Sequence, residues 1–265
     1  MKPFPNLLAL ALLATATAAN AASLPDTGQS TCYNGTVADA VDAASVTSVS
    51  SDAQTHPRQD CRYGRDPAAA TGASVKVGTG AKGFDYTKIA NNGGALDPGA
   101  LLGAAPTDWA CTRDNITGLI WEIKTSGPGS VRFSGHTYTW YNTDEATNGG
   151  FEGYRGGGTC AGTLNGNFCN TLAYTTAVNA DALCSYRDWR LPTLRELRTL
   201  VNADGSIPAV DASNFPNASP TPFWTAAPQA SDVSNAWNVD FADGESNVED
   251  KSRSNNVRLV RGVPF

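Results

Sequence analysis

The side chains best suited to covalent or metal chemistry are few in this sequence. It has six cysteines and two histidines, and no C-x-x-C pair that would indicate a zinc site. His56 and His136 lie in polar stretches, and neither has a suitable partner at short spacing. No G-x-S-x-G elbow marks a serine nucleophile, although a triad assembled in space would leave no such signal. We therefore predict that the chain is not an enzyme.

The cysteines predict disulfide bonds instead. An even number of cysteines after a secretion signal is typical of a protein whose thiols are oxidised to disulfides after export. Spacing alone allows many pairings. The pairing we favour closes a short loop with one disulfide, ties the start of the main domain to a later turn with another, and pins the N-terminal part with the third. These disulfides are Cys160–Cys169, Cys111–Cys184 and Cys32–Cys61, respectively.

Polar and aromatic side chains gather near the C-terminus, and we predict a binding surface there. Amides and carboxylates suit hydroxyl-rich ligands, and an exposed tryptophan can stack on a sugar ring. The predicted ligand-binding residues are Trp224, Trp237, Asn238, Asp240, Asp243, Glu245, Asn247, Arg253 and Asn255. The alternative is that both tryptophans are core residues, because Trp237 alternates with Val239 and Phe241. We predict no cofactor; calcium stays open through the carboxylates in this set, whose spacing is not that of an EF-hand.

The elements that would position these residues favour an α+β domain with two helices and short antiparallel strands. Thr193 and Glu196 have the spacing of a capping box and predict a helix directly after Pro192. Asp188 and Arg190 are expected to pair with each other or with nearby backbone. A second helix is expected over 172–184, and a hairpin turn at 243–244. Strands are expected over 119–124, 138–141, 223–227, 236–241 and 257–261.

Composition limits the partners and the compartment. Residues 1–22 resemble a signal peptide, so we expect a periplasmic or extracellular protein. The formal net charge of −6, without a cluster of basic residues, argues against nucleic acid and anionic membrane surfaces as partners. No later stretch is apolar enough to insert into a membrane. We expect an irregular, disulfide-pinned extension over 23–106 and the main domain over 107–265; the oligomeric state is left open.

Five segments of this domain, in this order and spacing, resemble the C-terminal domain of the Legionella collagen-like protein and its relatives. The segments are Asp114–Glu122 (DNITGLIWE), Asp188–Thr193 (DWRLPT), Phe223–Thr225 (FWT), Ala236–Phe241 (AWNVDF) and Val257–Arg261 (VRLVR). The resemblance implies a C-type-lectin-like fold, close to that of formylglycine-generating enzymes and of variable proteins diversified by retroelements. It also implies adhesin-like binding, because the named member binds a sulfated polysaccharide.

The sequence departs from that family in informative ways. It lacks a collagen-like Gly-x-y region and a basic patch that would hold sulfate groups. It also lacks the late reactive cysteine pair of the formylglycine-generating branch, since no cysteine follows Cys184. We therefore expect a secreted module that recognises a glycan or protein surface ligand through its C-terminal loops. The alternatives are a structural protein of the envelope and a retroelement-diversified variable binding protein.

Overall fold

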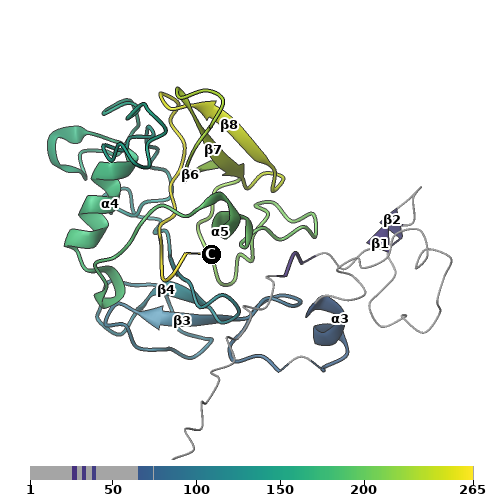
Figure 1. The fold of residues 1–265 in the computed structure, drawn as a ribbon. Coiled ribbons are helices and arrows are strands. Elements are labelled where there is room, and N and C mark those ends of the chain that lie inside the picture. Colours follow the sequence, from purple (N-terminus) through teal and green to yellow (C-terminus); the bar gives the residue numbers. More distant parts are fainter. Residues whose placement is uncertain (1–25, 29–31, 34–37, 40–64, 74, 265) are drawn as a thin grey trace, which may run out of the picture.

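The computed structural model describes residues 26–28, 32–33, 38–39, 65–73 and 75–264. The expected signal peptide, His56 and Cys61 lie outside the described residues, and with Cys61 so does the predicted Cys32–Cys61 disulfide. Figure 1 shows the main domain as two sheets with short helices and long loops around them. No helix in the described part of the chain is long and apolar enough to span a bilayer.

The first sheet joins segments from both ends of the domain. Its strands are β3 (Tyr86–Ala90), β4 (Trp109–Asp114), β5 (Ile120–Glu122) and β9 (Val260–Arg261), in that order and all antiparallel. The β4–β5 turn closes because the Asp114 carboxylate accepts the Ile116 N–H and Gly118 takes a φ of +76°. β3 belongs to this sheet although it precedes residue 107, where we expected the domain to begin.

The second sheet contains β6 (Pro222–Pro228), β7 (Asn235–Asp240) and β8 (Ser246–Asp250), again in antiparallel order. The predicted turn at Asp243-Gly244 is confirmed, with Gly244 at a φ of +81°. β8 was not predicted, because its sequence SNVED has no apolar alternation. The expected strand over 138–141 makes only isolated bridges, and the one over 257–261 is regular only in its last two residues. A separate two-stranded ribbon pairs β1 (Cys32–Tyr33) with β2 (Ala38–Asp39).

The helices are short. They are α3 (Arg65–Ala70), α4 (Thr171–Ala180) and α5 (Leu194–Arg198), with 3-10 turns η2 (Asn165–Asn167) and η3 (Leu183–Ser185). The predicted capping box is confirmed: Thr193 accepts the Glu196 N–H and the Glu196 carboxylate accepts the Thr193 N–H. The helix predicted over 172–184 ends earlier, because the backbone turns left-handed at Ala182.

The charges beside Trp189 bear out one of the two expected alternatives. The Arg190 guanidinium donates to the nearby Leu191 carbonyl at 3.2 Å, as the backbone alternative predicts, and it also contacts the buried Glu196 carboxylate at 2.7 Å. The Asp188 carboxylate contacts Arg261 at 2.8 Å, so Asp188 and Arg190 do not pair with each other. Each instead ties the Trp189 turn to a separate element, α5 or β9.

Two hydrophobic clusters fill the domain. One holds Trp140, Trp189 and Trp224, and the other holds Trp109 and Trp121 with Phe84 and Tyr86. Each cluster combines residues from both main sheets and from the loops, so the packing joins the two sheets. Two predicted disulfides, Cys111–Cys184 and Cys160–Cys169, are confirmed. The α+β prediction holds at the level of mostly antiparallel sheets with a few short helices.

Candidate functional site

The predicted binding residues lie on and around one hairpin, residues 235–250, which we call the outer hairpin because β8 is the outermost strand of its sheet (Figure 1). Its register separates them into two faces. Trp237 lies opposite Val248, whereas Asn238 lies opposite Asn247 and next to Trp224 on β6. Because side chains alternate along a strand, the tryptophan and the amides point to opposite sides of the sheet.

Trp237 is the tryptophan that stays accessible. The other five tryptophans of the chain are at most 5% exposed, whereas Trp237 is only partly buried. Its indole N–H donates to no described residue, and its cross-strand neighbour Val248 is 37% exposed. This pair forms an apolar spot on an otherwise polar hairpin.

Most of the polar residues of the predicted set are also accessible. Asp243, Glu245, Asn247 and Arg253 are exposed, and Asp240 is partly so. The Asp240 and Asp243 carboxylates each accept a backbone N–H two residues ahead, which fixes the turn between the strands. The rim of the outer hairpin is therefore polar and conformationally defined.

Three predicted binding residues are buried, which corrects the prediction that they face a ligand. Trp224 is fully buried and donates its indole N–H to the Tyr138 carbonyl at 2.8 Å. Asn238 is fully buried and Asn255 is 8% exposed; both donate to the Glu249 carboxylate. The Asn255–Asn256 segment covers the free edge of β6 by pairing Phe223 with Asn256, so this face is closed around Trp224.

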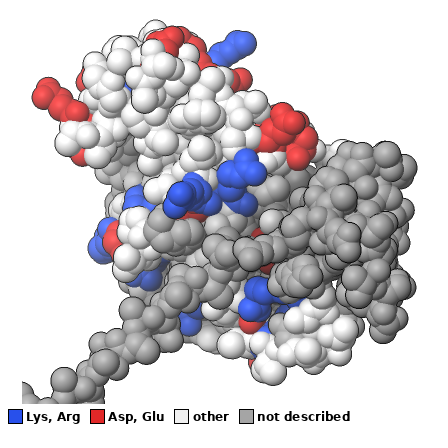
Figure 2. All heavy atoms as spheres, turned by 45° about the vertical axis from the view of Figure 1, so that its right-hand side comes forward, with Lys and Arg blue, Asp and Glu red and all other residues white. Residues whose placement is uncertain are grey.

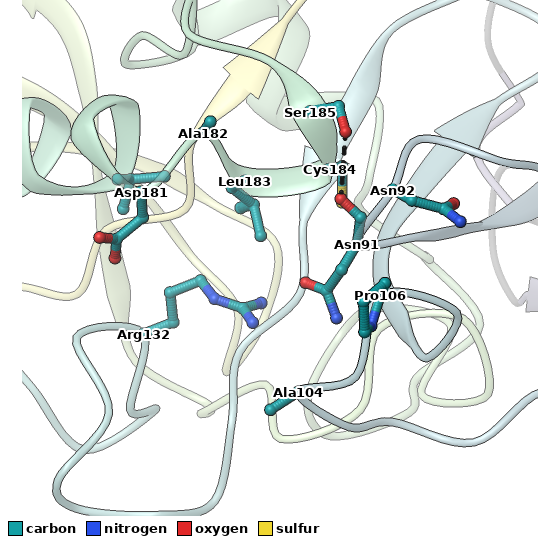
Figure 3. Close-up of a pocket in the computed structure, with 11 residues that line it drawn as sticks. Asn91, Asn92, Ala104, Pro106, Arg132, Asp181, Ala182, Leu183, Cys184 and Ser185 are labelled. Atoms are coloured by element: carbon teal, nitrogen blue, oxygen red, sulfur yellow. Dashed lines mark hydrogen bonds between the residues drawn. The ribbon is translucent and has the colours of Figure 1, made fainter.

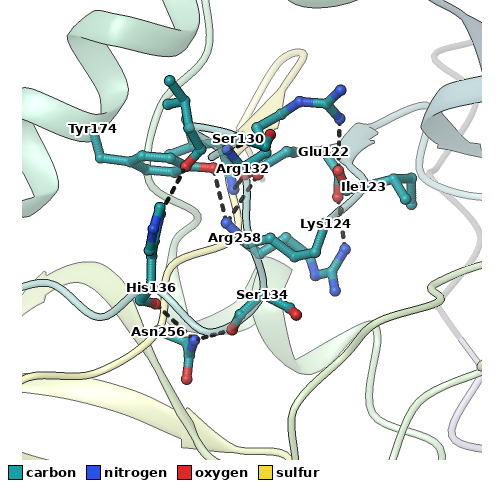
Figure 4. A network of polar contacts seen from close by, with 12 residues as sticks. Glu122, Ile123, Lys124, Ser130, Arg132, Ser134, His136, Tyr174, Asn256 and Arg258 are labelled. Carbon is teal, nitrogen blue, oxygen red and sulfur yellow. Dashed lines mark hydrogen bonds and ion pairs between the residues drawn. The ribbon is translucent and has the colours of Figure 1, made fainter. Parts of the chain in front are cut away.

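A buried ionic network holds the strongest perturbations of ionisation, and sequence reasoning missed it (Figure 4). The Glu122 carboxylate contacts the Lys124 ammonium at 2.9 Å, accepts the Tyr174 hydroxyl and accepts the Leu259 N–H at 2.9 Å. Burial lowers the pKa of Lys124 to about 8, against the attraction of Glu122, which raises it. Burial also lowers the pKa of Arg258, whose guanidinium donates to the Glu122 carbonyl, to about 10.

Strongly shifted groups often mark catalytic sites, but structural ion clusters shift pKa values as well. Here Glu122, Lys124, Tyr174 and Arg258 are each at most 1% exposed, so no substrate atom reaches them in this conformation. The network instead crosslinks β5, α4 and the segment leading into β9. The only sequence signal for it was charge within the apolar strand LIWEIK.

A pocket of about 510 Å³ opens between the end of α4 and the loop that follows β3. Figure 3 shows the Arg132 guanidinium reaching its middle, with Asp181 on one side and Asn91 on the other. No sequence motif marks this pocket, because the segments that line it are far apart in the chain. Elsewhere in the described chain, no group of three or more His, Cys, Asp or Glu residues comes together to hold a metal ion, so the calcium hypothesis gains no geometric support.

The surface near the outer hairpin is acidic in character. Figure 2 shows red acidic side chains scattered over the upper end of the molecule, where Figure 1 places β7 and β8, while most basic side chains lie lower. A sulfated ligand would meet repulsion there, whereas a neutral or cationic one would not.

The fold and the site define a class: a disulfide-bonded α+β domain of antiparallel sheets with an accessible C-terminal hairpin. Residues 110–261 match the family model described as the Lcl C-terminal domain. The match covers more than half of the sequence, and the chain belongs to this family, as the five segments indicated. No curated protein and no solved structure matches the chain.

Proposed function

We propose that this chain is a non-catalytic binding module, C-type-lectin-like in fold, that recognises a glycan or protein ligand on a surface through the outer hairpin. The signal-like N-terminus and the disulfides support a periplasmic or extracellular location. The observation that carries the proposal is Trp237, an accessible indole with an unpaired N–H beside Val248. Amphipathic aromatic residues of this kind dominate recognition of sugars and of protein surfaces.

The hairpin also has the support that a recognition surface needs. Glu249 accepts hydrogen bonds from Asn238 and Asn255 behind the strand, and Arg198 of α5 donates to the Ser246 hydroxyl at 2.7 Å. A surface held in this way loses little conformational entropy on binding. The exposed carboxylates of Asp243 and Glu245, at the turn of the hairpin, then supply directional contacts at the rim, whereas the exposed Asn247 amide lies on the opposite side of the sheet from Trp237.

The test is a glycan array and a protein-ligand screen with the full chain, its Trp237→Ala variant and its Asn247→Ala variant. We expect Trp237→Ala to weaken binding at least tenfold while the far-UV circular dichroism spectrum stays unchanged. Trp224→Ala is the control for removal of a buried tryptophan. We expect it to unfold the domain, so that its spectrum changes, whereas Trp237→Ala loses binding with its fold intact. A stable Trp237→Ala protein that binds as tightly as the parent contradicts the proposal, and so does the absence of any ligand in both screens.

A further inference from the structure

The pocket at the end of α4 has an apolar wall and unused polar groups of both charges. Val178, Leu183, Cys184 and Pro106 are among the residues that line it. The Arg132 Nη1 donates to the Ala110 and Ile123 carbonyls at 3.2 and 2.7 Å, which fixes the guanidinium. Its Nε and Nη2 have no acceptor among the described residues. The cation is thus positioned while part of its hydrogen-bonding capacity faces the pocket.

Acceptors face the same space. The Asp181 carboxylate is exposed and accepts no hydrogen bond from a described residue. Asn91 donates through its Nδ2 to the Gly103 and Ala105 carbonyls, which orients the amide and leaves Oδ1 free as an acceptor. In Figure 3 the guanidinium of Arg132 lies between these two acceptors. The pocket therefore offers a fixed donor cation with acceptors on both sides of it.

The wall of the pocket is rigid and strained. Ala182, Cys184 and Ser185 have φ values of +51°, +52° and +66°, a left-handed conformation that residues other than glycine rarely adopt. The Cys111–Cys184 disulfide anchors this turn to β4, and the Trp189 indole donates to the Leu183 carbonyl at 3.1 Å. Strain of this kind persists only where the surroundings enforce it, and it gathers at ligand sites. The turn is therefore a preformed wall rather than a loop that closes on demand.

We propose that this pocket binds a small zwitterion, a free amino acid or a dipeptide, separately from the outer hairpin. The ligand carboxylate pairs with Arg132, its ammonium pairs with the Asp181 carboxylate, and its side chain lies against Val178 and Leu183. Asp181 would repel a simple anion, and Arg132 would repel a simple amine. The pocket therefore selects a ligand that carries both charges. Free amino acids and dipeptides share this chemistry and differ in the separation of their charges.

Isothermal titration calorimetry of the full, oxidised chain tests the proposal with L-leucine and glycyl-L-leucine. The matched probes are 4-methylpentanoate, which lacks the ammonium of leucine, and 3-methylbutylamine, which lacks its carboxylate. We expect at least one zwitterion to bind, and each single-charge probe to bind at least tenfold more weakly than leucine or not at all. The stronger zwitterion identifies the charge separation that the pocket accepts. If neither zwitterion binds at millimolar concentration, the proposal is overturned.

Variants locate the binding. Asp181→Asn should cut zwitterion affinity at least fivefold and bring leucine and 4-methylpentanoate to within threefold of each other. Arg132→Lys should weaken the binding of leucine and of 4-methylpentanoate. If that variant loses structure, Asp181→Asn decides the test, because the Asp181 side chain makes no hydrogen bond to a described residue that the fold would lose. Glu145→Gln, which removes an exposed carboxylate elsewhere, and Trp237→Ala should change nothing. Unchanged zwitterion preference in Asp181→Asn, or loss of binding in Trp237→Ala, contradicts the assignment.

Discussion

Removing the Lys124 ammonium tests whether the buried ionic network holds the domain together. In Lys124→Met the Glu122 carboxylate keeps the Tyr174 hydroxyl and the Leu259 N–H but loses its contact at 2.9 Å with a cation. Methionine fills a similar volume, so the variant isolates charge from packing. Burial raises the pKa of Tyr174 well above its usual value, which keeps its hydroxyl a donor in both proteins.

The expected loss of unfolding free energy in Lys124→Met follows from the surroundings of the Glu122 carboxylate, which the substitution leaves without its cation. Breaking a buried ion pair by removing one partner costs about 3–5 kcal/mol of unfolding free energy. We expect a cost near the lower end, about 3 kcal/mol, because the Arg258 guanidinium contacts the Glu122 carbonyl at 2.7 Å and still provides positive charge. The double variant Glu122→Gln/Lys124→Met has no unpaired buried charge at this pair, and its free energy of unfolding should lie within about 1 kcal/mol of that of the parent.

Urea unfolding at pH 7, followed by tryptophan fluorescence, measures the four proteins of this double-mutant cycle.

Two results would refute this reasoning. A cost below about 1 kcal/mol for Lys124→Met would mean that Glu122 needs no counterion, and that the network is incidental. A double variant as unstable as the sum of the single variants would mean that each side chain acts through packing rather than through the pair.

Two further perturbations concern His136 and the disulfides. Burial lowers the pKa of His136, whose ring lies against Phe133 and Tyr138, so the unfolded chain binds a proton more readily than the folded chain does. Stability should therefore fall as the pH drops below the unfolded pKa of about 6.5, and His136→Phe should flatten that slope in urea titrations. The two disulfides should differ in their contribution to stability, because Cys111–Cys184 closes a loop with a sequence separation of 73 and Cys160–Cys169 one with a separation of 9. Replacing both cysteines by serine should lower the free energy of unfolding by about 4 kcal/mol for the first disulfide and by about 2.5 kcal/mol for the second. The reverse order in urea unfolding would mean that native-state contacts outweigh chain entropy.

Local sequence rules worked where a local rule decides the structure. The Thr193–Glu196 capping box and the Asp243-Gly244 turn depend on residues within a few positions of each other, and both formed as predicted. The strand β8 could not be predicted in this way, because SNVED becomes a strand only by pairing with β7. The aromatic run at 138–141 shows the opposite case: strand propensity is high, yet packing in the core replaces a regular ladder.

The two tryptophans of the predicted site show why a candidate surface is harder to predict than an element. Trp224 and Trp237 have similar neighbours in sequence. What separates them is the register of the sheet, which puts Trp224 and Trp237 on opposite faces, and the segment 255–256, which covers the free edge of β6 and leaves the β8 side open. Contacts between segments that distant in the chain leave no periodic signal. The charged residues behave likewise, since Arg258 looks like an ordinary polar position in the sequence and is buried only by the fold.

The end of β8 shows how the outer hairpin is joined to the body of the domain. Lys251 follows β8 directly and is fully buried; its ammonium donates to the Asn148 and Phe151 carbonyls and lies 4.2 Å from the Trp140 ring centre. No carboxylate among the described residues pairs with it, so its charge is stabilised by carbonyl dipoles and an aromatic face. Because these contacts pin the glycine-rich loop around residue 150 to the hairpin base, the two must move together. If the hairpin binds a ligand as proposed, the binding surface is held in position by the core, which lowers the conformational entropy lost on binding at Trp237.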